Sequence, residues 1–438
     1  MENMENMITR VNDTSTTIKY NIFDFLYLII GVPWIFLMIM SVRLFSDVKM
    51  YFLIALLFVL FIDFIVNVKK INKAILAFTF IFITYFFISL IIGIYSGYDF
   101  SLTRDISLIE NYIALPIIVV LFGKVFNMRP YRKKALWTVI IFITFLLVFL
   151  DVIKIWFFGI GFKTNLLSFI MIADDYDTSA KLSIRLANEP CMMFLVPIFV
   201  FLLFDGSKKR ISKIVLYSMI VFLGITYALI SGRKMLEFII LLSLLLTLFY
   251  RFFIDESTKK NYFNNLRFII LFPIVVLLLV QFVNMFSVFS NINDILPRAI
   301  QTFVDGFSSS SHGVIKRENN ASALINLWSN SPFWGNGLNS YAIDSIASST
   351  TKWSYEVVYI ALLAQTGIFG VLLFFIPLIY IVRGLIINYK NEKNSIYVGI
   401  VIGLIAFVIC GSTNPLVYFI WPWMISYTFS FESGGDTL

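Results

Sequence analysis

The stretch KRENNASALINLWSNSPFWGNGLNSYAIDSIASSTTKWSYEVVYIALLAQTGIFG, residues 316 to 370, decides how the chain is organised. It ends the only long polar segment of a chain that is otherwise almost continuously hydrophobic, and it leads directly into the apolar run Ile368 to Val382. Loops longer than about 15 residues without regular structure usually carry function or disorder. We therefore expect this stretch to form the functional part of the protein, held at a membrane surface by the rest of the chain.

The composition indicates the class of protein. Of the 438 residues, 59% are hydrophobic and only 14% are charged, against roughly 25% charged residues in soluble domains. The apolar runs are continuous rather than alternating, which favours membrane-spanning helices over a barrel of strands. The predicted fold class is an all-α polytopic membrane protein with a large outer loop.

Twelve apolar runs are candidates for transmembrane helices, because a helix needs about 20 mainly apolar residues to cross the hydrocarbon core. They are Ile22 to Ser41, Met50 to Val68, Ala74 to Tyr95, Ile106 to Phe122, Ala135 to Phe157, Pro190 to Phe204, Ile214 to Ile230, Met235 to Phe253, Phe268 to Phe286, Tyr359 to Val382, Ser395 to Cys410 and Pro415 to Phe431. The last two are separated by only GSTN, so a single re-entrant hairpin is the alternative there.

The distribution of lysine and arginine predicts the orientation. These residues collect in short cytoplasmic loops, and here the short loops on one side are basic without exception. Both termini are therefore assigned to the cytoplasm, and the net charge of +8 is interpreted as topology rather than as nucleic-acid binding. Spans in residues 1–286 and 359–431 then flank a large outer loop, 287–358, with a second outer loop at 159–189 and a cytoplasmic tail at 432–438.

Few residues are available for metal or disulfide chemistry. His312 is the sole histidine, which excludes a histidine-rich metal site, and no metal or other cofactor is predicted. Cys191 and Cys410 lie in or beside apolar runs, so no disulfide framework is expected.

Ionisable residues within the spans crowd toward the predicted outer face, whereas Asp24 and Asp63 lie toward the inner half. Charged groups in spans are costly and mark functional sites by default. A transporter concentrates such groups near the midplane of the membrane, so this pattern favours a site that opens on the outer leaflet. The outer group consists of Glu110, Asp151, Lys154, Glu189, Arg233 and Glu237.

Three arginines beside carboxylates are expected on the outer face. Arg233 lies next to Lys234 in the turn SGRK, Arg185 precedes Glu189 in RLANEP, and Arg317 lies in the large loop. The planar guanidinium group suits bidentate binding of oxyanions, so these residues are candidates to hold a phosphate at the level of the lipid headgroups. The alternative is that they are snorkelling anchors, or that they simply pair with the neighbouring carboxylates.

The large loop also has a predictable local structure. An amphipathic helix is indicated by the apolar residues Ala321, Leu324, Ile325, Leu327 and Trp328. Gly335 and Gly337 in SPFWGNGLN supply turn conformations. The aromatic residues of the loop either stack on sugar rings or form an interfacial belt. They are Trp328, Trp334, Tyr341, Trp353 and Tyr355.

Taken in order, these motifs resemble the large outer loop of bacterial O-antigen polymerases and ligases. Arg317 precedes a helix that contains Trp328, the pattern PxxGxGxN runs from Pro332 to Asn339, and a tyrosine-led helix ends in LLAQTGIxG at Leu362 to Gly370. SGRK resembles the serine-arginine turn of that superfamily, and RLANEP resembles the entry motif of its repeat-unit polymerases. The resemblance covers about half of the chain, residues 185 to 370.

The resemblance implies a GT-C-like, metal-independent glycosyltransferase of the bacterial inner membrane, acting on undecaprenyl-diphosphate-linked sugars as donor and acceptor. Its implied partners are these lipid-linked oligosaccharides, membrane lipids, a flippase and a chain-length regulator. Nucleic acid is not among them. Such a protein would make O-antigen, capsule or another surface polysaccharide. Ligases carry a histidine at the start of the tyrosine-led helix, where this chain has Glu356, and this departure favours a repeat-unit polymerase over a ligase.

In the predicted reaction, a hydroxyl of an incoming lipid-linked repeat unit attacks the anomeric carbon of the growing chain and expels undecaprenyl diphosphate. Arg185, Arg233 and Arg317 would stabilise the charge that develops on this leaving group. Glu356 or Glu189 would accept the hydroxyl proton as general base. Further contacts with the diphosphate or the glycan are predicted for Lys234, Trp328, Asn339 and Tyr355.

Two other functions remain open at this point. An O-antigen ligase-type transferase would move a finished glycan to another acceptor and would not build a ladder of lengths. A lipid-linked oligosaccharide transporter or flippase, from a different class, would move substrate across the membrane without changing the length of the glycan.

Overall fold

In the computed structural model of the chain, residues 22–40, 46–67, 73–159, 189–205, 211–231, 234–251, 312–346, 351–412 and 418–431 are described. Every regular element within these ranges is a helix, so the predicted all-α class is confirmed for them. The predicted span Phe268 to Phe286 and most of the loop at 159–189 lie outside the described residues.

Seven helices in the described residues are long and apolar enough to cross a membrane, and each corresponds to a predicted span. Two of them contain a short π-helical segment. They are α2 (Ile22–Leu26), η1 (Tyr27–Gly31) and α3 (Val32–Met40) as one; α4 (Ser46–Asn67); α5 (Lys73–Tyr95); α6 (Leu102–Ile109), η2 (Glu110–Ala114) and α7 (Leu115–Asn127) as one; α8 (Pro130–Gly159); α11 (Ile211–Ser231); and α16 (Val358–Glu392). The chain is therefore a multi-pass membrane protein.

Shorter apolar helices occupy the places of four other predicted spans. These are α10 (Glu189–Phe204), α12 (Lys234–Phe249), α17 (Ser395–Cys410) and α18 (Ile420–Ser430). With 11 residues, α18 extends only about 16 Å at 1.5 Å per residue. This is less than the hydrocarbon core of about 30 Å. In the described residues 418–431, the span predicted over Pro415 to Phe431 is therefore a short helix, and residues 415–417 lie outside the described residues.

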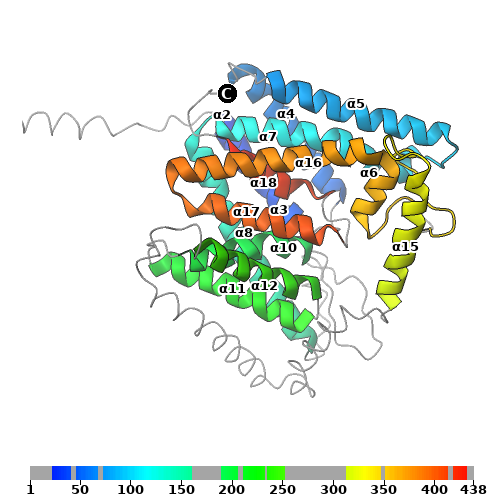
Figure 1. Cartoon of the computed structure of the whole chain (residues 1–438). Coiled ribbons are helices and arrows are strands. Elements are labelled where there is room, and N and C mark those ends of the chain that lie inside the picture. Colours follow the sequence, from blue (N-terminus) through cyan, green and yellow to red (C-terminus); the bar gives the residue numbers. More distant parts are fainter. Residues whose placement is uncertain are drawn as a thin grey trace, which may run out of the picture.

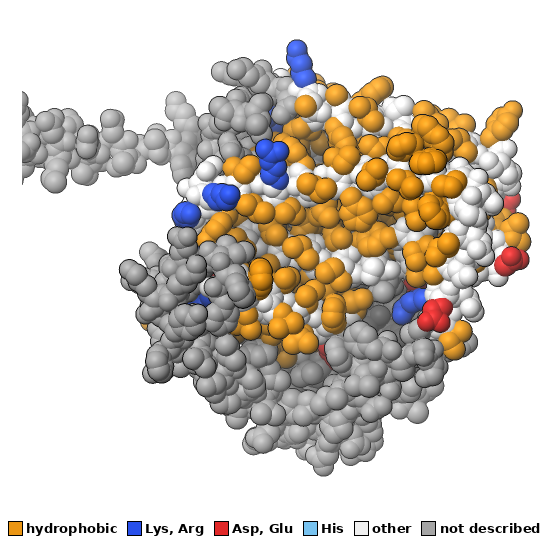
Figure 2. All heavy atoms as spheres, viewed as in Figure 1, with side chains coloured by type: hydrophobic (Ala, Val, Ile, Leu, Met, Phe, Trp, Pro, Cys, Tyr) orange, Lys and Arg blue, Asp and Glu red, His pale blue; other side chains and the backbone are white. Residues whose placement is uncertain are grey.

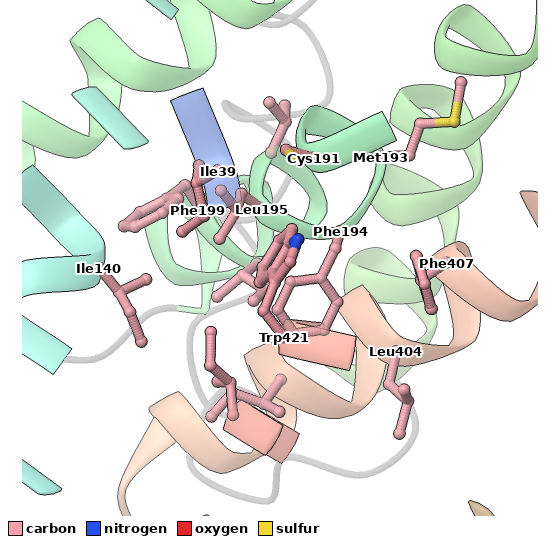
Figure 3. Packing of buried hydrophobic residues seen from close by; sticks show 14 of the residues in the cluster. Ile39, Ile140, Cys191, Met193, Phe194, Leu195, Phe199, Leu404, Phe407 and Trp421 are labelled. Atoms are coloured by element: carbon pink, nitrogen blue, oxygen red, sulfur yellow. The ribbon is translucent and has the colours of Figure 1, made fainter. Parts of the chain in front are cut away.

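The short helix α18 lies at the centre of the bundle. Every residue after Ile420 in this helix is buried, and the helix packs against α7, α16 and α17. Figure 3 shows Trp421 among Phe194 of α10 and Leu404 and Phe407 of α17. The rings of Trp421 and Phe194 meet edge to face with 5.3 Å between centroids, a preferred aromatic geometry. Because lipid tails are as apolar as these side chains, close packing rather than exclusion from water holds the helices together.

The two ends of the bundle carry different groups. In Figure 1, α5, α7 and α16 run across the view, and α15 (His312–Ser329) stands across their right-hand end. Figure 2 shows a mostly hydrophobic face with most of its lysine and arginine side chains toward the left and upper edges, and acidic side chains with a basic neighbour toward the right edge. We call the end with α15 the outer end and the opposite end the inner end, in keeping with the predicted orientation.

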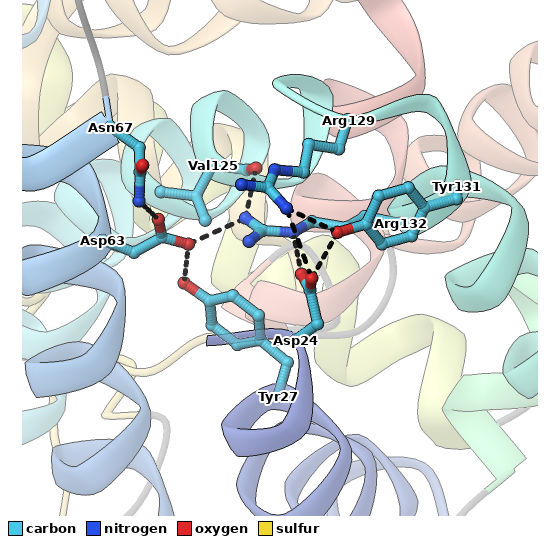
Figure 4. Close-up of polar contacts among 8 residues, drawn as sticks. All are labelled: Asp24, Tyr27, Asp63, Asn67, Val125, Arg129, Tyr131 and Arg132. Atoms are coloured by element: carbon cyan, nitrogen blue, oxygen red, sulfur yellow. Dashed lines mark hydrogen bonds and ion pairs between the residues drawn. The ribbon is translucent and has the colours of Figure 1, made fainter. Parts of the chain in front are cut away.

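Buried ion pairs join three helices at the inner end (Figure 4). Arg132 of α8 donates from Nε to Asp24 Oδ1 of α2 and from Nη1 to Asp63 Oδ2 of α4, both at 2.7 Å. The Arg132 and Asp63 side chains are 3% and 0% exposed. Tyr27 and Asn67 donate to the two oxygens of Asp63 at 2.9 and 2.5 Å. Buried charges are tolerated when they are paired and hydrogen-bonded in this way, so the network fixes α2, α4 and α8 to one another.

Candidate functional site

The helix α15 lies against the first turns of α16 at the outer end. Leu324 is fully buried and packs with Tyr355, Val357 and Ala361, which lead into α16 or belong to it. The predicted amphipathic helix is thus confirmed, over a longer range than its apolar pattern indicated. Its apolar face fixes α15 beside the point where the chain re-enters the membrane.

A break in α16 at Gly367 receives the loop that follows α15. Gly367 has φ 65° and ψ −173°, a region of the Ramachandran plot that is essentially restricted to glycine. A Cβ atom at this position would lie 2.2 Å from the carbonyl oxygen of Phe333. Any side chain would therefore push the loop away from the helix.

Four backbone hydrogen bonds across the break replace the bonds that an unbroken helix would make. The amides of Asn336 and Gly337 donate to the carbonyls of Ala364 and Gln365 at 3.1 and 2.9 Å, and the amides of Ile368 and Phe369 donate to the carbonyls of Pro332 and Phe333 at 3.0 and 3.3 Å. Unpaired backbone groups at membrane depth cost several kcal/mol each, so the loop satisfies the groups that the break exposes. We call residues 332–337 paired with residues 364–369 the clasp.

The clasp is also attached to α15 by side chains. Asn336 Nδ2 donates to the carbonyl oxygens of Leu327 and Ala364 at 2.8 and 3.1 Å. Trp328 Nε1 donates to the carbonyl of Pro332 at 2.9 Å. The last turn of α15 is therefore held at a fixed place relative to α16.

The segment after the clasp is fixed to the end of α5. The amide of Leu338 donates to the carbonyl of Ser89 at 3.1 Å, and Asn339 Nδ2 donates to the carbonyl of Tyr98 at 3.2 Å. A Cβ atom on Gly337 would lie 2.1 Å from the Cα atom of Gly93, so two glycines allow the backbones to touch. The predicted turn role of Gly335 and Gly337 is confirmed, since both have positive φ.

Two further contacts tie the later part of the loop to the connection between α5 and α6 and to the first turn of α6. Lys352 Nζ donates to Asp99 Oδ2 at 2.7 Å, and this hydrogen bond raises the pKa of Lys352. Trp353 Nε1 donates to Asp105 Oδ1 at 2.9 Å. The loop is therefore a folded cap on the spans over its described length.

An accessible ion pair lies on this cap. Arg317 Nε donates to Glu356 Oε2 at 2.9 Å, and the two side chains are 38% and 56% exposed. Arg317 lies in the first half of α15 and Glu356 shortly before α16, so the packing of α15 on α16 sets their separation. Exposed pairs contribute only about 0 to 1 kcal/mol to stability. The fold does not depend on this pair, and both groups are free to meet a ligand.

No family model matches the chain, and no curated protein matches it in sequence. It is a multi-pass, all-helical membrane protein. Any finer assignment rests on the chemistry of the outer end.

The other predicted site residues fall into two groups. Trp328, Asn339 and Tyr355 form part of the frame: Asn339 and Tyr355 are buried, and the Tyr355 hydroxyl accepts a hydrogen bond from the amide of Ala342 at 2.9 Å. Burial raises the pKa of Tyr355. A substrate contact for these three residues stays a prediction.

The second group lies wholly or partly outside the described residues. Arg185 and Arg233 are not described, and neither are the side chains of Glu189 and Lys234, the first residues of α10 and α12. Whether three arginines converge on one cavity therefore stays a prediction. Among the described residues, no group of three or more His, Cys, Asp or Glu side chains is arranged to hold a metal ion.

The sequence motifs alone predict no structural role for Asn336 and Gly367, which hold the clasp together. Asn336 lies in WGNGLN and Gly367 in LLAQTGIFG. An isolated glycine within an apolar helical pattern is a signal for a break or a close backbone approach. Applied to Gly367, this signal would have predicted an interruption of α16.

Proposed function

We propose that the chain is a glycosyltransferase that joins lipid-linked oligosaccharide repeat units at the outer face of the plasma membrane. The observation that supports this most is the Arg317–Glu356 pair, which is exposed on a cap held to the spans by backbone hydrogen bonds. A rigid frame that presents a cation beside a carboxylate is suited to transfer from an anionic leaving group, because catalytic groups act best when they are held in place.

Glu356 is the proposed general base. Its carboxylate is more than half exposed, so an acceptor hydroxyl can approach within hydrogen-bonding distance, which is the first requirement for proton transfer. Arg317 holds this carboxylate in the absence of substrate. The same guanidinium group can turn its planar fork to a diphosphate, for which arginine is well suited.

The proposed step balances without a further reactant. The oxygen of the acceptor hydroxyl forms a bond to the anomeric carbon of the growing chain, and its proton passes to Glu356. The bond from that carbon to the diphosphate oxygen breaks, and its electron pair leaves with the undecaprenyl diphosphate. Arg317, together with Arg185 and Arg233 in this proposal, stabilises the charge on the leaving group. The energy of the new bond comes from the lipid-linked donor.

The proposal is tested with the full chain reconstituted in vesicles that contain lipid-linked repeat units. Arg317→Ala and Glu356→Gln should leave single, unpolymerised repeats, whereas Lys316→Ala, a change of the neighbouring exposed cation, should leave the ladder of lengths intact. A ladder of normal length from both site variants would refute the assignment. Transfer of a preassembled glycan to another acceptor, without a ladder, would instead identify a ligase.

A further inference from the structure

A groove opens between α5 and α16 toward the inner end of the bundle. The two helices meet at the outer end, where the Tyr85 hydroxyl donates to the carbonyl of Thr366 at 2.5 Å. Toward the inner end they are separated by a cavity of about 330 Å³, with α7 and α18 behind it. The cavity extends along α5 from Phe82 to Ala74, about 12 Å at 1.5 Å per residue.

The lining of this groove is almost entirely hydrocarbon and aromatic. It includes Phe78 and Phe82 of α5, Val119 of α7 and Pro377 of α16. The wall atoms of an empty groove lose the dispersion contacts that a close-packed neighbour would give. Because the surrounding helices are of membrane-spanning length, an alkyl chain from the bilayer is the natural occupant.

One buried hydroxyl in the lining lacks a partner. Tyr427 of α18 is 5% exposed, and its hydroxyl makes no hydrogen bond with any described residue. Its ring lies against Gly123, near the inner end of α7, where an added Cβ atom would approach it to 2.3 Å. The hydroxyl oxygen itself is not accessible from the groove, so a bound lipid would contact the ring of Tyr427 and not its hydroxyl.

Cations flank the inner mouth of the groove. Lys73 begins α5 and directly precedes the lining residue Ala74. Arg383 lies one turn beyond the lining residue Tyr380 on α16, within electrostatic range of its hydroxyl. Both cationic side chains are exposed, on the side of the bundle where lysine and arginine gather in Figure 2.

We propose that this groove binds one acyl chain of an anionic phospholipid from the inner leaflet, with the phosphate between Lys73 and Arg383. Basic pockets between helices on the cytoplasmic side are suited to anionic headgroups, and each cation near the surface contributes about 1 kcal/mol. A neutral lipid would fill the groove without using the cations. The site lies at the opposite end of the bundle from Arg317 and Glu356 and does not depend on the proposed transferase activity.

The headgroup part of the proposal is tested by lipid retention. The full chain is equilibrated in nanodiscs with equal amounts of phosphatidylglycerol and phosphatidylcholine, released, and analysed by native mass spectrometry. Phosphatidylglycerol should be retained in preference, and the double variant Lys73→Gln, Arg383→Gln should lower that preference by roughly tenfold to thirtyfold. The control Lys316→Gln, Lys352→Gln, which removes two cations at the outer end, should leave it unchanged. Equal retention of the two lipids, or no effect of the double variant, would overturn the proposal.

The acyl-chain part needs a second pair of variants. Thr79→Trp places a large side chain in the groove and should abolish retention of the lipid. Ile54→Trp is the control, because it adds a similar large side chain on the exposed surface of α4, outside the groove. This variant should retain the lipid as the wild-type chain does. Retention by Thr79→Trp at the unchanged level would contradict the proposal. Retention of a co-purified isoprenoid diphosphate that the two phospholipids do not displace would also contradict it and would assign the groove to the carrier lipid.

Discussion

The two ends of the bundle are stabilised by different kinds of interaction. At the inner end, charged side chains that are almost fully buried hold α2, α4 and α8 together through Arg132, Asp24 and Asp63. At the outer end, the clasp uses backbone groups, and its geometry depends on glycine at position 367. The only charged pair that links α15 to the segment before α16 in the described residues, Arg317 with Glu356, is exposed.

This difference separates charges that maintain the fold from charges that can act on a ligand. A buried ion pair maintains the structure, since removing one of its members leaves the other charge buried without a partner. The clasp at the outer end is made by the main chain and does not need Arg317 or Glu356 for its stability. Arg317 and Glu356 are therefore available for chemistry in a way that Arg132 and Asp63 are not.

The largest loss of stability is expected from Arg132→Ala. This change leaves the carboxylates of Asp24 and Asp63 without their shared cation, and breaking a buried pair in this way costs about 3 to 5 kcal/mol. Thermal unfolding of the purified protein in detergent measures the effect.

Arg129→Ala is the matched control for that variant. Arg129 also reaches Asp24, at 3.4 Å, but its side chain is 30% exposed, so its loss should cost at most about 1 kcal/mol. Equal losses of stability in Arg132→Ala and Arg129→Ala would show that the buried network contributes no more than an ordinary surface pair.

The next largest effect is expected at the helix break. Gly367→Ala forces a side chain into a backbone conformation that costs about 1 to 3 kcal/mol and into contact with the carbonyl of Phe333. The clasp should open, and hydrogen exchange at the amides of Asn336, Gly337, Ile368 and Phe369 should become faster.

Gly97→Ala is the control that introduces backbone strain without a steric clash. Gly97 also has positive φ, but an added Cβ atom there would meet nothing within 4 Å. It should cost about 1 to 2 kcal/mol and leave exchange at the clasp amides as it is. Faster exchange in Gly97→Ala to the same degree would show that the clasp does not depend on the fit of Gly367.

Much of the outer end follows from local sequence, and the part that does not is non-local. The amphipathic pattern around Leu324 predicts α15, and the glycines of WGNGLN predict turns. No local pattern indicates that the amide of Asn336 pairs with the carbonyl of Ala364, because the bond exists only where the helix breaks and the loop returns to it. At the inner end, Asp24 and Asp63 stand out as acids in apolar runs, but Arg132 looks like one of many cytoplasmic cations until the fold brings it between them.

A smaller effect is expected from Asn336→Ala. The change removes both side-chain hydrogen bonds of Asn336 Nδ2, each worth about 0.5 to 1.5 kcal/mol net, and leaves the backbone pairing in place. Thermal unfolding should shift down moderately, and exchange at the last turn of α15 should rise. Asn330→Ala, at an exposed asparagine just beyond α15, is the control and should shift neither.

The smallest change in stability, and the largest in activity, is expected for the exposed pair. Arg317→Ala should alter the free energy of unfolding by no more than about 1 kcal/mol, because the pair is exposed and Glu356 remains solvated without Arg317. Lys316→Ala, at the adjacent exposed position, provides the baseline for removing a cation from α15.

The most direct test measures unfolding and glycan length on the same preparations of Arg317→Ala, Glu356→Gln and Lys316→Ala. If Arg317 and Glu356 act in catalysis and the clasp stabilises the outer end without them, all three variants should unfold as the wild-type chain does. Only Arg317→Ala and Glu356→Gln should then fail to extend lipid-linked repeats. Long glycans from Arg317→Ala and Glu356→Gln, or loss of activity only in step with loss of stability, would contradict this account.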